Sequence, residues 1–288
     1  MLEMGLMSKV LRVIALAIFL IWLIIPIAWT FSLSFKPYLE WRVAYFWPKN
    51  PTLLNYKILF FYEREIAGTT GGTALTKPMT TPLINTLIVV GISTIIAVLI
   101  GFFTAYGASR YRSPGPFGLY FTLLTRMVPP ATFVTPVLVY YRMIGLLDSH
   151  IGLILLYAAA TVTYSIWIIK GFIDHIPREW EEAALLEGLS PINVITKVTL
   201  PLVKSALVVS GLFVFLMNYS EFLFALVLTT KYDVRTLPVH LSTYVGGSGA
   251  LYGAQAACGI IASLIPLVIG YVIQKHLITG LTFGMVRA

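Results

Sequence analysis

This sequence has little charge, one cysteine and none of the short motifs that mark common nucleotide-binding or hydrolytic sites. Of its 288 residues, 11% are charged and 58% are hydrophobic. A soluble domain carries roughly a quarter charged residues, so the shortage of charge indicates a polytopic membrane protein. The single cysteine, Cys258, excludes an intramolecular disulfide, and it lies in an apolar run where we expect a buried small hydrophobe.

The missing motifs narrow the possible functions further. No G-x-x-x-x-G-K-[ST] phosphate loop occurs, and no glycine is followed directly by lysine, so this chain lacks such a loop for ATP. H-E-x-x-H and G-x-S-x-G are also missing. The four histidines stand singly, and we expect them to be solvated residues at the ends of spans: His150, His175, His240 and His276. The sequence therefore predicts no catalytic residue, no metal site and no cofactor in this chain.

The net charge of +8 raises the question of a nucleic-acid partner. The basic residues are scattered among loops instead of forming a patch, which fits membrane topology better than nucleic-acid binding. We expect the bilayer to be a partner and nucleic acid not to be one.

Six apolar runs predict six membrane-spanning helices. Each is long enough for the ~20 apolar residues that cross a bilayer. They lie at about 10–31, 83–107, 117–141, 150–169, 202–228 and 254–274. The first run exceeds the roughly 7–15 residues of a signal-peptide core and has no A-x-A-like cleavage site after it, so we expect a retained span.

The runs divide the chain into three regions. These are 1–82, with the first span and a long external loop, 83–275, with a five-helix core, and 276–288, a C-terminal tail. An even number of spans places both termini on one side. Cytoplasmic termini put Lys9, Arg12, Arg110, Arg112, Lys170, Arg178, Lys197, Lys204, Lys275 and Arg287 inside. That distribution follows the positive-inside rule, which predicts a multi-pass protein of a prokaryotic cell membrane with both ends in the cytoplasm.

The polar stretch 171–201 interrupts the second half of the chain and lies on the cytoplasmic side of this topology. Its five carboxylates, out of twelve in the chain, are Asp174, Glu179, Glu181, Glu182 and Glu187. The pattern predicts two short helices: Pro177 suits a first turn, and Gly188 ends that helix in a left-handed turn. Ser190 caps the second helix, Pro191 opens it, and Pro201 ends it.

One face of the first short helix is suited to docking. Helical spacing places Trp180, Ala183, Ala184 and Glu187 on that face. Alanines permit close approach, and a carboxylate can pair with an arginine of a partner. A helix lying on lipid headgroups is the alternative, but such helices are usually rich in Lys and Arg, whereas this one is acidic. The composition favours a protein partner.

The same stretch resembles the EAA loop of ABC importer permeases. The matching residues are Glu182–Ala183–Ala184, Gly188 and Val198–Thr199–Leu200–Pro201. Val198 replaces the usual isoleucine, and Leu189 replaces a common alanine. Further stretches resemble the carbohydrate-uptake branch, in particular the second permease subunit of maltose-type transporters: Ser32–Pro37, Pro51–Tyr56, Gly145–Asp148, Tyr219–Leu226 and Gly280–Ala288. An insert at 63–80 does not belong to the pattern.

This resemblance implies an all-α membrane protein with six transmembrane helices and the MetI-like architecture of binding-protein-dependent ABC importer permeases. The implied function is ATP-driven import, with a sugar as the expected solute. The residues implied to couple to the ATPase are Glu182, Ala183, Ala184, Glu187, Gly188 and Pro201. A second contact is implied for the tail at 280–288.

The implied partners complete the transporter around this chain. A second permease subunit supplies the other half of the translocation pathway, and two separate ABC ATPase subunits bind ATP and Mg. A solute-binding protein outside the membrane delivers the solute. Which sugar is carried, and whether this subunit touches it, does not follow from the sequence.

A few polar residues and prolines inside the predicted spans are candidates for the pathway. Arg126, Asn218 and Glu221 are buried in apolar surroundings, where charge is costly and marks functional sites. They either line a cavity for the solute or are structural. In the structural alternative, Arg126 and Glu221 form a pair, or each is satisfied at the interface with the partner permease. Pro129 and Pro130 predict a kink, either a gate lining a cavity or a static bend.

Two other classes of function stay open. An ion-coupled secondary transporter needs paired ionisable groups, for which Arg126 and Glu221 are the candidates, and often inverted repeats, which we do not find. An intramembrane enzyme needs a nucleophile and a base, and no such set is visible. An ABC permease for a solute other than a sugar is a further alternative.

Overall fold

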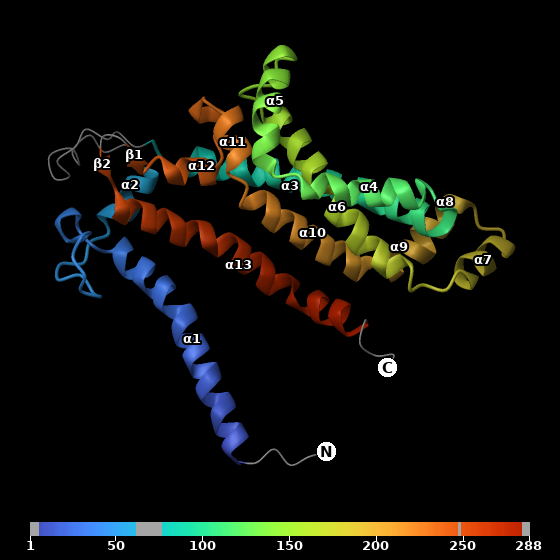
Figure 1. The fold of residues 1–288 in the computed structure, drawn as a ribbon, viewed down its shortest axis with the longest axis horizontal. Helices are drawn as coiled ribbons and strands as arrows, with labels where there is room; N and C mark the ends of the chain where they lie inside the picture. Colours follow the sequence, from blue (N-terminus) through green and yellow to red (C-terminus); the bar gives the residue numbers. More distant parts are fainter. Residues whose placement is uncertain (1–5, 62–76, 247–248, 284–288) are drawn as a thin grey trace. The chain divides into compact units, whose positions relative to one another are not determined.

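The computed structural model describes residues 6–61, 77–246 and 249–283, whose regular structure is helical apart from one short hairpin (Figure 1). The elements are α1 (Leu6–Ser34), η1 (Tyr38–Glu40), α2 (Leu54–Phe60), α3 (Thr80–Tyr111), α4 (Gly115–Met127), α5 (Pro130–Met143), α6 (His150–Ile173), α7 (Glu179–Leu186), α8 (Pro191–Val194), η3 (Ile195–Thr199), α9 (Leu200–Leu202), α10 (Lys204–Tyr219), α11 (Leu223–Leu228), η4 (Tyr232–Val234), α12 (Leu237–Ser242), β1 (Val245–Gly246), β2 (Gly249–Ala250) and α13 (Tyr252–Phe283). Strands β1 and β2 pair antiparallel. Most of the predicted insert at 63–80 lies outside the described residues.

Four of the six predicted spans are single helices long and apolar enough to cross a membrane. They are Ser8–Ser34, Thr80–Tyr111, His150–Ile173 and Tyr252–Gln274. The other two are helix pairs, α4 with α5 bent by 95° and the helical stretch Pro191–Leu202 with α10 bent by 73°. The described chain therefore has up to six spans if each bent pair counts as one.

The bends correct two of the predicted boundaries. The run 117–141 breaks at Val128, where the backbone is extended, because Pro129 and Pro130 cannot continue the hydrogen-bond ladder of α4. The run 202–228 is not one helix, since α10 ends at Tyr219 and α11 is a separate short helix. At the other end of the chain, α13 continues to Phe283, so 276–283 extends a helix and 284–288 lies outside the described residues.

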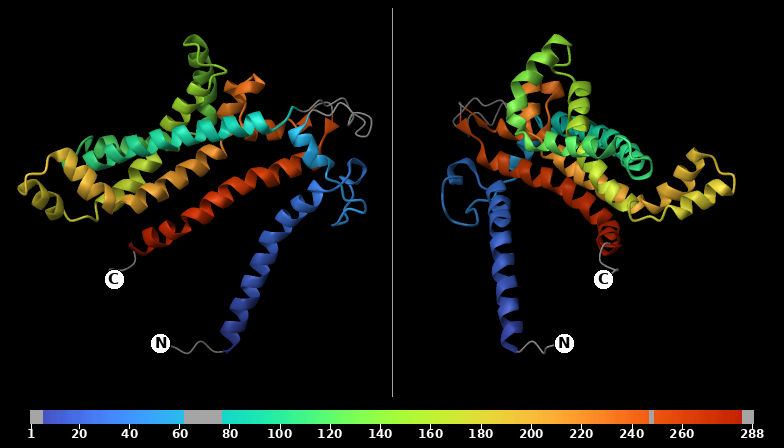
Figure 2. Two further views of the ribbon diagram at one scale, coloured as in Figure 1. Left: turned by 180° about the vertical axis from the view of Figure 1, so that it is seen from behind. Right: turned by 45° about the vertical axis from the view of Figure 1, so that its right-hand side comes forward.

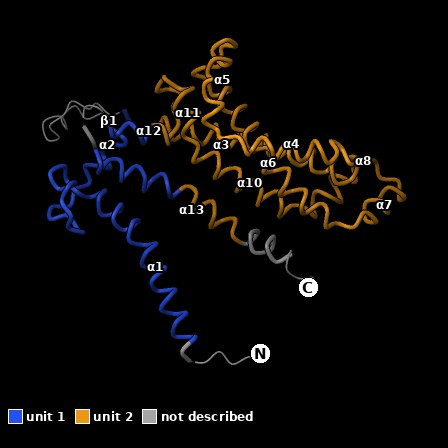
Figure 3. Tube along the Cα trace, viewed as in Figure 1, with its two compact units in different colours: residues 1–80, 240–264 blue, residues 81–239, 265–288 orange. Residues whose placement is uncertain are grey.

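The chain forms two compact units, residues 1–80 with 240–264 and residues 81–239 with 265–288 (Figure 3). In the first unit, a buried lysine organises the segment after α1. Lys36 is fully buried, and its Nζ donates to the carbonyl oxygens of Val43 and Tyr45 at 3.1 and 2.6 Å. The same nitrogen lies 4.4 Å from the centroid of the Trp29 ring. Carbonyl dipoles and the ring face thus stabilise this cation. Cys258 is fully buried in the same unit, as predicted.

In the second unit, α3, α6 and α10 run alongside one another (Figures 1 and 2). Small buried residues recur at every fourth position along α3: Ser93, Ala97, Gly101 and Ala105. One of them, Gly101, lets α6 approach closely. A Cβ on Gly101 would lie 2.3 Å from Cβ of Ser165. Helices packed within a membrane associate through such close contact and through polar bridges, because lipid supplies no hydrophobic drive between them.

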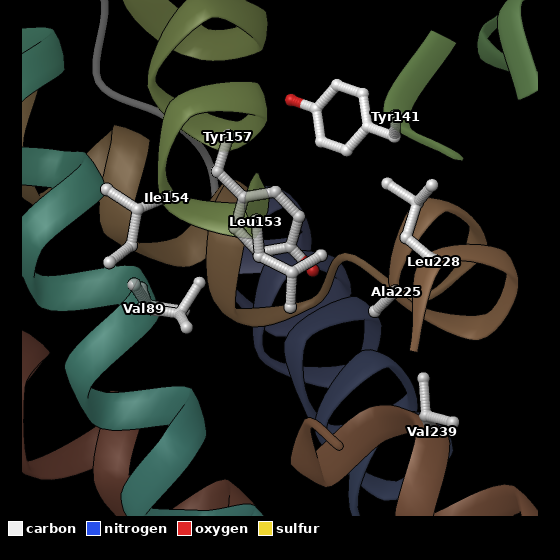
Figure 4. Packing of buried hydrophobic residues seen from close by; sticks show 9 residues of the cluster. Val89, Tyr141, Leu153, Ile154, Tyr157, Ala225, Leu228 and Val239 are labelled. Carbon is white, nitrogen blue, oxygen red and sulfur yellow. The ribbon is translucent and has the colours of Figure 1, made fainter. Parts of the chain in front are cut away.

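A cluster of buried side chains packs α5, α11 and α12 against α3 and α6 (Figure 4). Leu153, Ile154 and Tyr157 of α6 pack with Val89 of α3. The same cluster includes Tyr141 of α5, Ala225 and Leu228 of α11, and Val239. Helix α5 and the short helix α11 are thereby held to α3, α6 and α10.

Candidate functional site

The polar stretch folds as the α7–α8 loop, residues 174–203, at one end of the second unit (Figure 2). Gly188 has a φ of +89°, which confirms the predicted left-handed turn after α7. The N–H of Leu189 donates to the carbonyl oxygen of Ala184 at 3.1 Å and closes the end of that helix. The Oγ of Ser190 accepts from the N–H of Asn193 at 3.4 Å, and Pro191 follows in the first turn of α8. The predicted bend between two short helices is confirmed.

The end of the second helix differs from the prediction. Pro201 does not end it, because helical turns run from α8 through the π-helical turn η3 into α9. The direction changes at Val203, before α10. Pro201 lies within this continuous helical stretch, where it cannot donate to the preceding turn, and the direction changes two residues later.

The inward face of α7 carries a carboxylate that the sequence did not single out. Glu181 is 6% exposed. Its Oε1 accepts from Nε of Arg110 at 3.0 Å and from Oγ1 of Thr199 at 2.8 Å. Its Oε2 accepts from Oη of Tyr106 at 3.1 Å. We call these four side chains the Glu181 cluster; they join α7 and η3 to the end of α3.

Two further hydrogen bonds fasten the start of the loop to the same end of α3. Nη2 of Arg178 donates to the carbonyl oxygen of Ser109 at 2.7 Å. Nη2 of Arg110 donates to the carbonyl oxygen of Ile176 at 3.2 Å. A signal for this contact was present in the sequence, since Tyr106 and Arg110 stand four residues apart at the end of a predicted span.

The outward face of α7 is open and mixed in character. Glu182, Ala183 and Glu187 are exposed. Leu186 is 91% exposed, and Trp180 is also exposed. Helical spacing placed Ala184 on the same face, but it is only 9% exposed, because it lies near Glu181 on the side of α7 that packs inward.

Asn218 and Glu221 make their hydrogen bonds inside this chain. Asn218 is 3% exposed, and its Nδ2 donates to Oγ of Ser93 at 3.1 Å and to Oγ1 of Thr161 at 3.4 Å. Glu221 is half-buried, and its Oε2 accepts from Oη of Tyr157 at 2.7 Å. The same carboxylate accepts from the N–H groups that open α11, at 2.8 and 3.2 Å.

Arg126 does not pair with Glu221, so the predicted structural pair is wrong. Its Nη2 donates to the carbonyl oxygen of Ala160, and its guanidinium lies 5.1 Å from the centroid of the Tyr164 ring. Among the described residues, the ion pairs are Arg110–Glu181 and Lys170–Asp174. The charged pair that ion coupling would need is therefore not formed between these two residues. Whether any of the three touches a solute stays a prediction, as does a gating role for Pro129 and Pro130.

A polar contact also anchors the opposite end of α3. Nδ2 of Asn85 donates to the carbonyl oxygens of Asp233 and Arg235 at 2.8 and 3.0 Å, and its Oδ1 lies 2.9 Å from Nε2 of His150. Because the amide nitrogen already donates, Oδ1 accepts, and we assign the donor proton to Nε2 of His150.

A loop carboxylate holds the neighbouring turn of the second unit. Asp148 accepts from the N–H groups of Thr230 and Lys231 at 2.6 and 2.9 Å. Partial burial alone would raise the pKa of Asp148, but these hydrogen bonds outweigh it and hold the pKa below its ordinary value.

Two of the histidines differ from the prediction of solvated flanking residues. His150 is half-buried and bonded to Asn85, and His240 is buried and lies 3.2 Å from Oη of Tyr244. His175 is exposed, as predicted. The side chain of His276 is outside the described part. Within that part, no group of three His, Cys, Asp or Glu side chains is arranged to hold a metal ion.

Comparison with known proteins gives consistent matches. A family model described as "Binding-protein-dependent transport system inner membrane component" matches residues 97–282. The trehalose transport system permease protein SugB of Mycobacterium tuberculosis is 31% identical over 267 residues, 92% of each chain. The trehalose/maltose transport system permease protein MalG of Thermococcus litoralis is 31% identical over 70% of this chain and 74% of that protein. The maltodextrin transport system permease protein MdxG of Bacillus subtilis is 31% identical over 69% and 73%.

Two solved structures share the fold. A chain of a bacterial ABC transporter involved in the import of the acidic polysaccharide alginate has a TM-score of 0.73 at 20% identity, covering 96% of this chain and 98% of that one. A chain of the MetNI methionine ABC transporter in an inward-facing conformation has a TM-score of 0.55 at 16% identity, covering 71% and 99%. Both support the expected all-helical permease architecture.

Proposed function

Because this chain belongs to the family of binding-protein-dependent transport system inner membrane components, we propose that it is the permease subunit of an ATP-driven importer for a sugar. One observation carries the proposal: similarity to a trehalose permease extends over 92% of both chains. The maltose and maltodextrin permeases among its relatives support the same class of solute.

ATP hydrolysis takes place in separate ATPase subunits, because this chain has no phosphate loop. The outward face of α7 is their docking surface, with both termini and the α7–α8 loop in the cytoplasm. Leu186 supplies the apolar contact, and burying a leucine side chain stabilises a complex by about 1.5–3 kcal/mol. Glu182 and Glu187 supply carboxylates for basic residues of the ATPase.

The other predicted coupling residues shape this surface. Ala183 leaves room for close approach, and Gly188 sets the bend that presents α7. Ala184 and Pro201 act from within: Ala184 packs inward, and Pro201 opens the last helical turn before the chain bends into α10. A second permease subunit forms the other half of the pathway, and a solute-binding protein delivers the sugar from the opposite side of the membrane.

Among the three polar residues inside the spans, Arg126 is the best candidate to meet the solute. Asn218 and Glu221 already bond within the chain. The Nε of Arg126 is buried and has no hydrogen-bond partner in the described part of the structure. A donor without a partner is costly, and rotation of this half-buried side chain would bring it to a sugar hydroxyl.

The docking surface is tested by purifying the chain together with the products of its neighbouring genes. We expect an ATPase to copurify with the native chain and with Glu182→Asp, which keeps the carboxylate. Glu182→Lys places a cation where a basic partner residue is expected and should abolish copurification. Intact copurification and intact ATPase activity in Glu182→Lys would show that this face is not the docking surface.

The solute class is tested on the neighbouring binding protein. Calorimetric titration with trehalose, maltose, maltodextrin and a galactooligosaccharide should show saturable binding of at least one. Binding of an amino acid, a peptide or a metal ion in place of all four sugars would contradict the sugar assignment. It would leave the permease assignment standing.

A further inference from the structure

We propose that Glu181 is a positioning residue that fastens the α7–α8 loop to α3, so that a partner displacing the loop also displaces α3. The inference rests on the proposed function, in which an ATPase docks on the outward face of α7. It concerns the inward face of the same helix, which no partner needs to touch.

The chain itself does not connect the loop to α3. The loop follows α6 and leads through α8, η3 and α9 into α10, whereas α3 lies more than sixty residues earlier in the sequence. Movement of the loop therefore reaches α6 and α10 along the backbone, and from them it reaches α3 through helix packing such as that of Gly101 on Ser165. A direct route from the loop to α3 needs a contact of its own. The Glu181 cluster and the two flanking arginine bonds supply that contact.

Burial strengthens the contacts within the Glu181 cluster. The side chains of Arg110 and Glu181 are 7% and 8% exposed, so water does not screen their attraction. An exposed pair contributes little to stability, whereas breaking a buried one leaves a charge uncompensated. Thr199 is fully buried and donates to the same oxygen as Arg110, which ties the second half of the loop to the same carboxylate.

Helix α3 is suited to carry movement across the second unit. It is continuous over 32 residues, roughly 48 Å at the usual rise of 1.5 Å per residue. Its only proline, Pro82, lies near its start, so it has none of the interior breaks of the two bent pairs. Near its middle, Ser93 accepts from Asn218 of α10, and near its far end Asn85 holds the segment at 233–235.

The consequence is a distinct role for each of two adjacent glutamates. Glu182 faces outward and receives the partner, and Glu181 faces inward and transmits the displacement to α3. Loss of Glu181 should uncouple the loop from α3 without removing the docking surface.

The test measures the distance between the loop and α3 in the assembled transporter. Spin labels are attached to Thr196→Cys in the loop and Phe103→Cys on α3, both exposed positions, with Cys258→Ser removing the native thiol. Pulsed electron paramagnetic resonance in lipid nanodiscs records the distances without nucleotide and with ATP plus vanadate. For the native loop we expect one narrow distribution that is the same in both states.

Two variants weaken the cluster to different degrees. Glu181→Gln removes the ion pair and should broaden the distribution at least twofold in both states while the ATPase still copurifies. Tyr106→Phe removes only one hydrogen bond, remains informative if the first variant misfolds, and should give a smaller broadening in the same direction. Glu179→Gln removes an exposed carboxylate of the same turn and should leave the distribution narrow.

A purely stabilising role predicts a different pattern. Tyr157→Phe weakens the same unit far from the loop, by removing a hydrogen bond to Glu221. Equal broadening in that variant, or a narrow distribution in both Glu181→Gln and Tyr106→Phe, would overturn the proposal. The distance without nucleotide tests the contact with α3 even if no ATPase copurifies, so failure of the proposed function and failure of this inference give different results.

Discussion

Two glutamates in the second unit, one buried and one half-buried, are satisfied by the structure in different ways. Glu181, at the loop end of α3, faces a guanidinium, a phenol and a hydroxyl. Glu221, next to α11, accepts from Tyr157 and from two backbone N–H groups. The first carboxylate has a cation as its partner, and the second relies on neutral donors alone.

The difference follows from what each position demands. A cation beside Glu221 would bring a second charge into a mostly apolar environment, and the cost of desolvating two ions often exceeds their attraction. A helix N-terminus offers N–H groups that are already oriented and need a partner, so one carboxylate completes α11. At Glu181 the link must join three separate elements, and a charged pair provides a strong, directional contact between them.

The largest loss of stability should come from leaving the buried carboxylate of Glu181 without its cation. Arg110→Ala removes the guanidinium and leaves Glu181 buried and charged, which should lower the free energy of unfolding by about 3–5 kcal/mol. Denaturant unfolding in detergent measures this loss. The double variant Arg110→Ala with Glu181→Gln removes the isolated charge and should recover part of the stability. A loss below about 1 kcal/mol in the single variant would mean that the pair behaves like an exposed one.

Removing one hydrogen bond from Glu221 should cost less stability than removing the cation from Glu181. Tyr157→Phe removes one donor from Glu221 and leaves its two backbone donors in place, so we expect a loss of about 1.5–3 kcal/mol, the usual range for a hydrogen bond to a charged group. The same unfolding experiment measures it, and Tyr141→Phe, whose hydroxyl donates to a carbonyl oxygen instead, is the matched control. A loss in Tyr157→Phe as large as that in Arg110→Ala would remove the distinction between the two sites.

Local sequence signals predicted the parts of this site that local chemistry determines. Gly188, Ser190 and Pro191 each specify a turn or a cap through their own backbone or side chain, and each was placed correctly. Long apolar runs predicted where helices of span length occur. The size of a bend could not be predicted. Pro129 and Pro130 predict a break, but the 95° angle depends on how α5 packs against α11.

The roles of adjacent residues could not be predicted in the same way. Glu181 and Glu182 are the same residue type one position apart, so they point about 100° away from each other around a helix. Which of them faces inward depends on Arg110, 71 residues earlier in the chain. The burial of Ala184 has the same origin, because it lies three residues from Glu181 on the face that packs inward. The pairing of loop and α3 is therefore a tertiary property.

The smallest expected effect on stability is that of substituting Glu182, the exposed neighbour of Glu181. Glu182 is exposed, and substitutions at such positions usually change the free energy of unfolding by no more than about 0.5 kcal/mol. We therefore expect Glu182→Gln to unfold like the native chain while it weakens association with the ATPase. Side-by-side unfolding and copurification of Glu181→Gln and Glu182→Gln measure both properties. The first variant should lose stability but retain the partner, and the second should do the reverse. Equal loss of stability in both variants would contradict the separate roles of the two faces of α7, because Glu182 would then have to contribute to the packing of the loop.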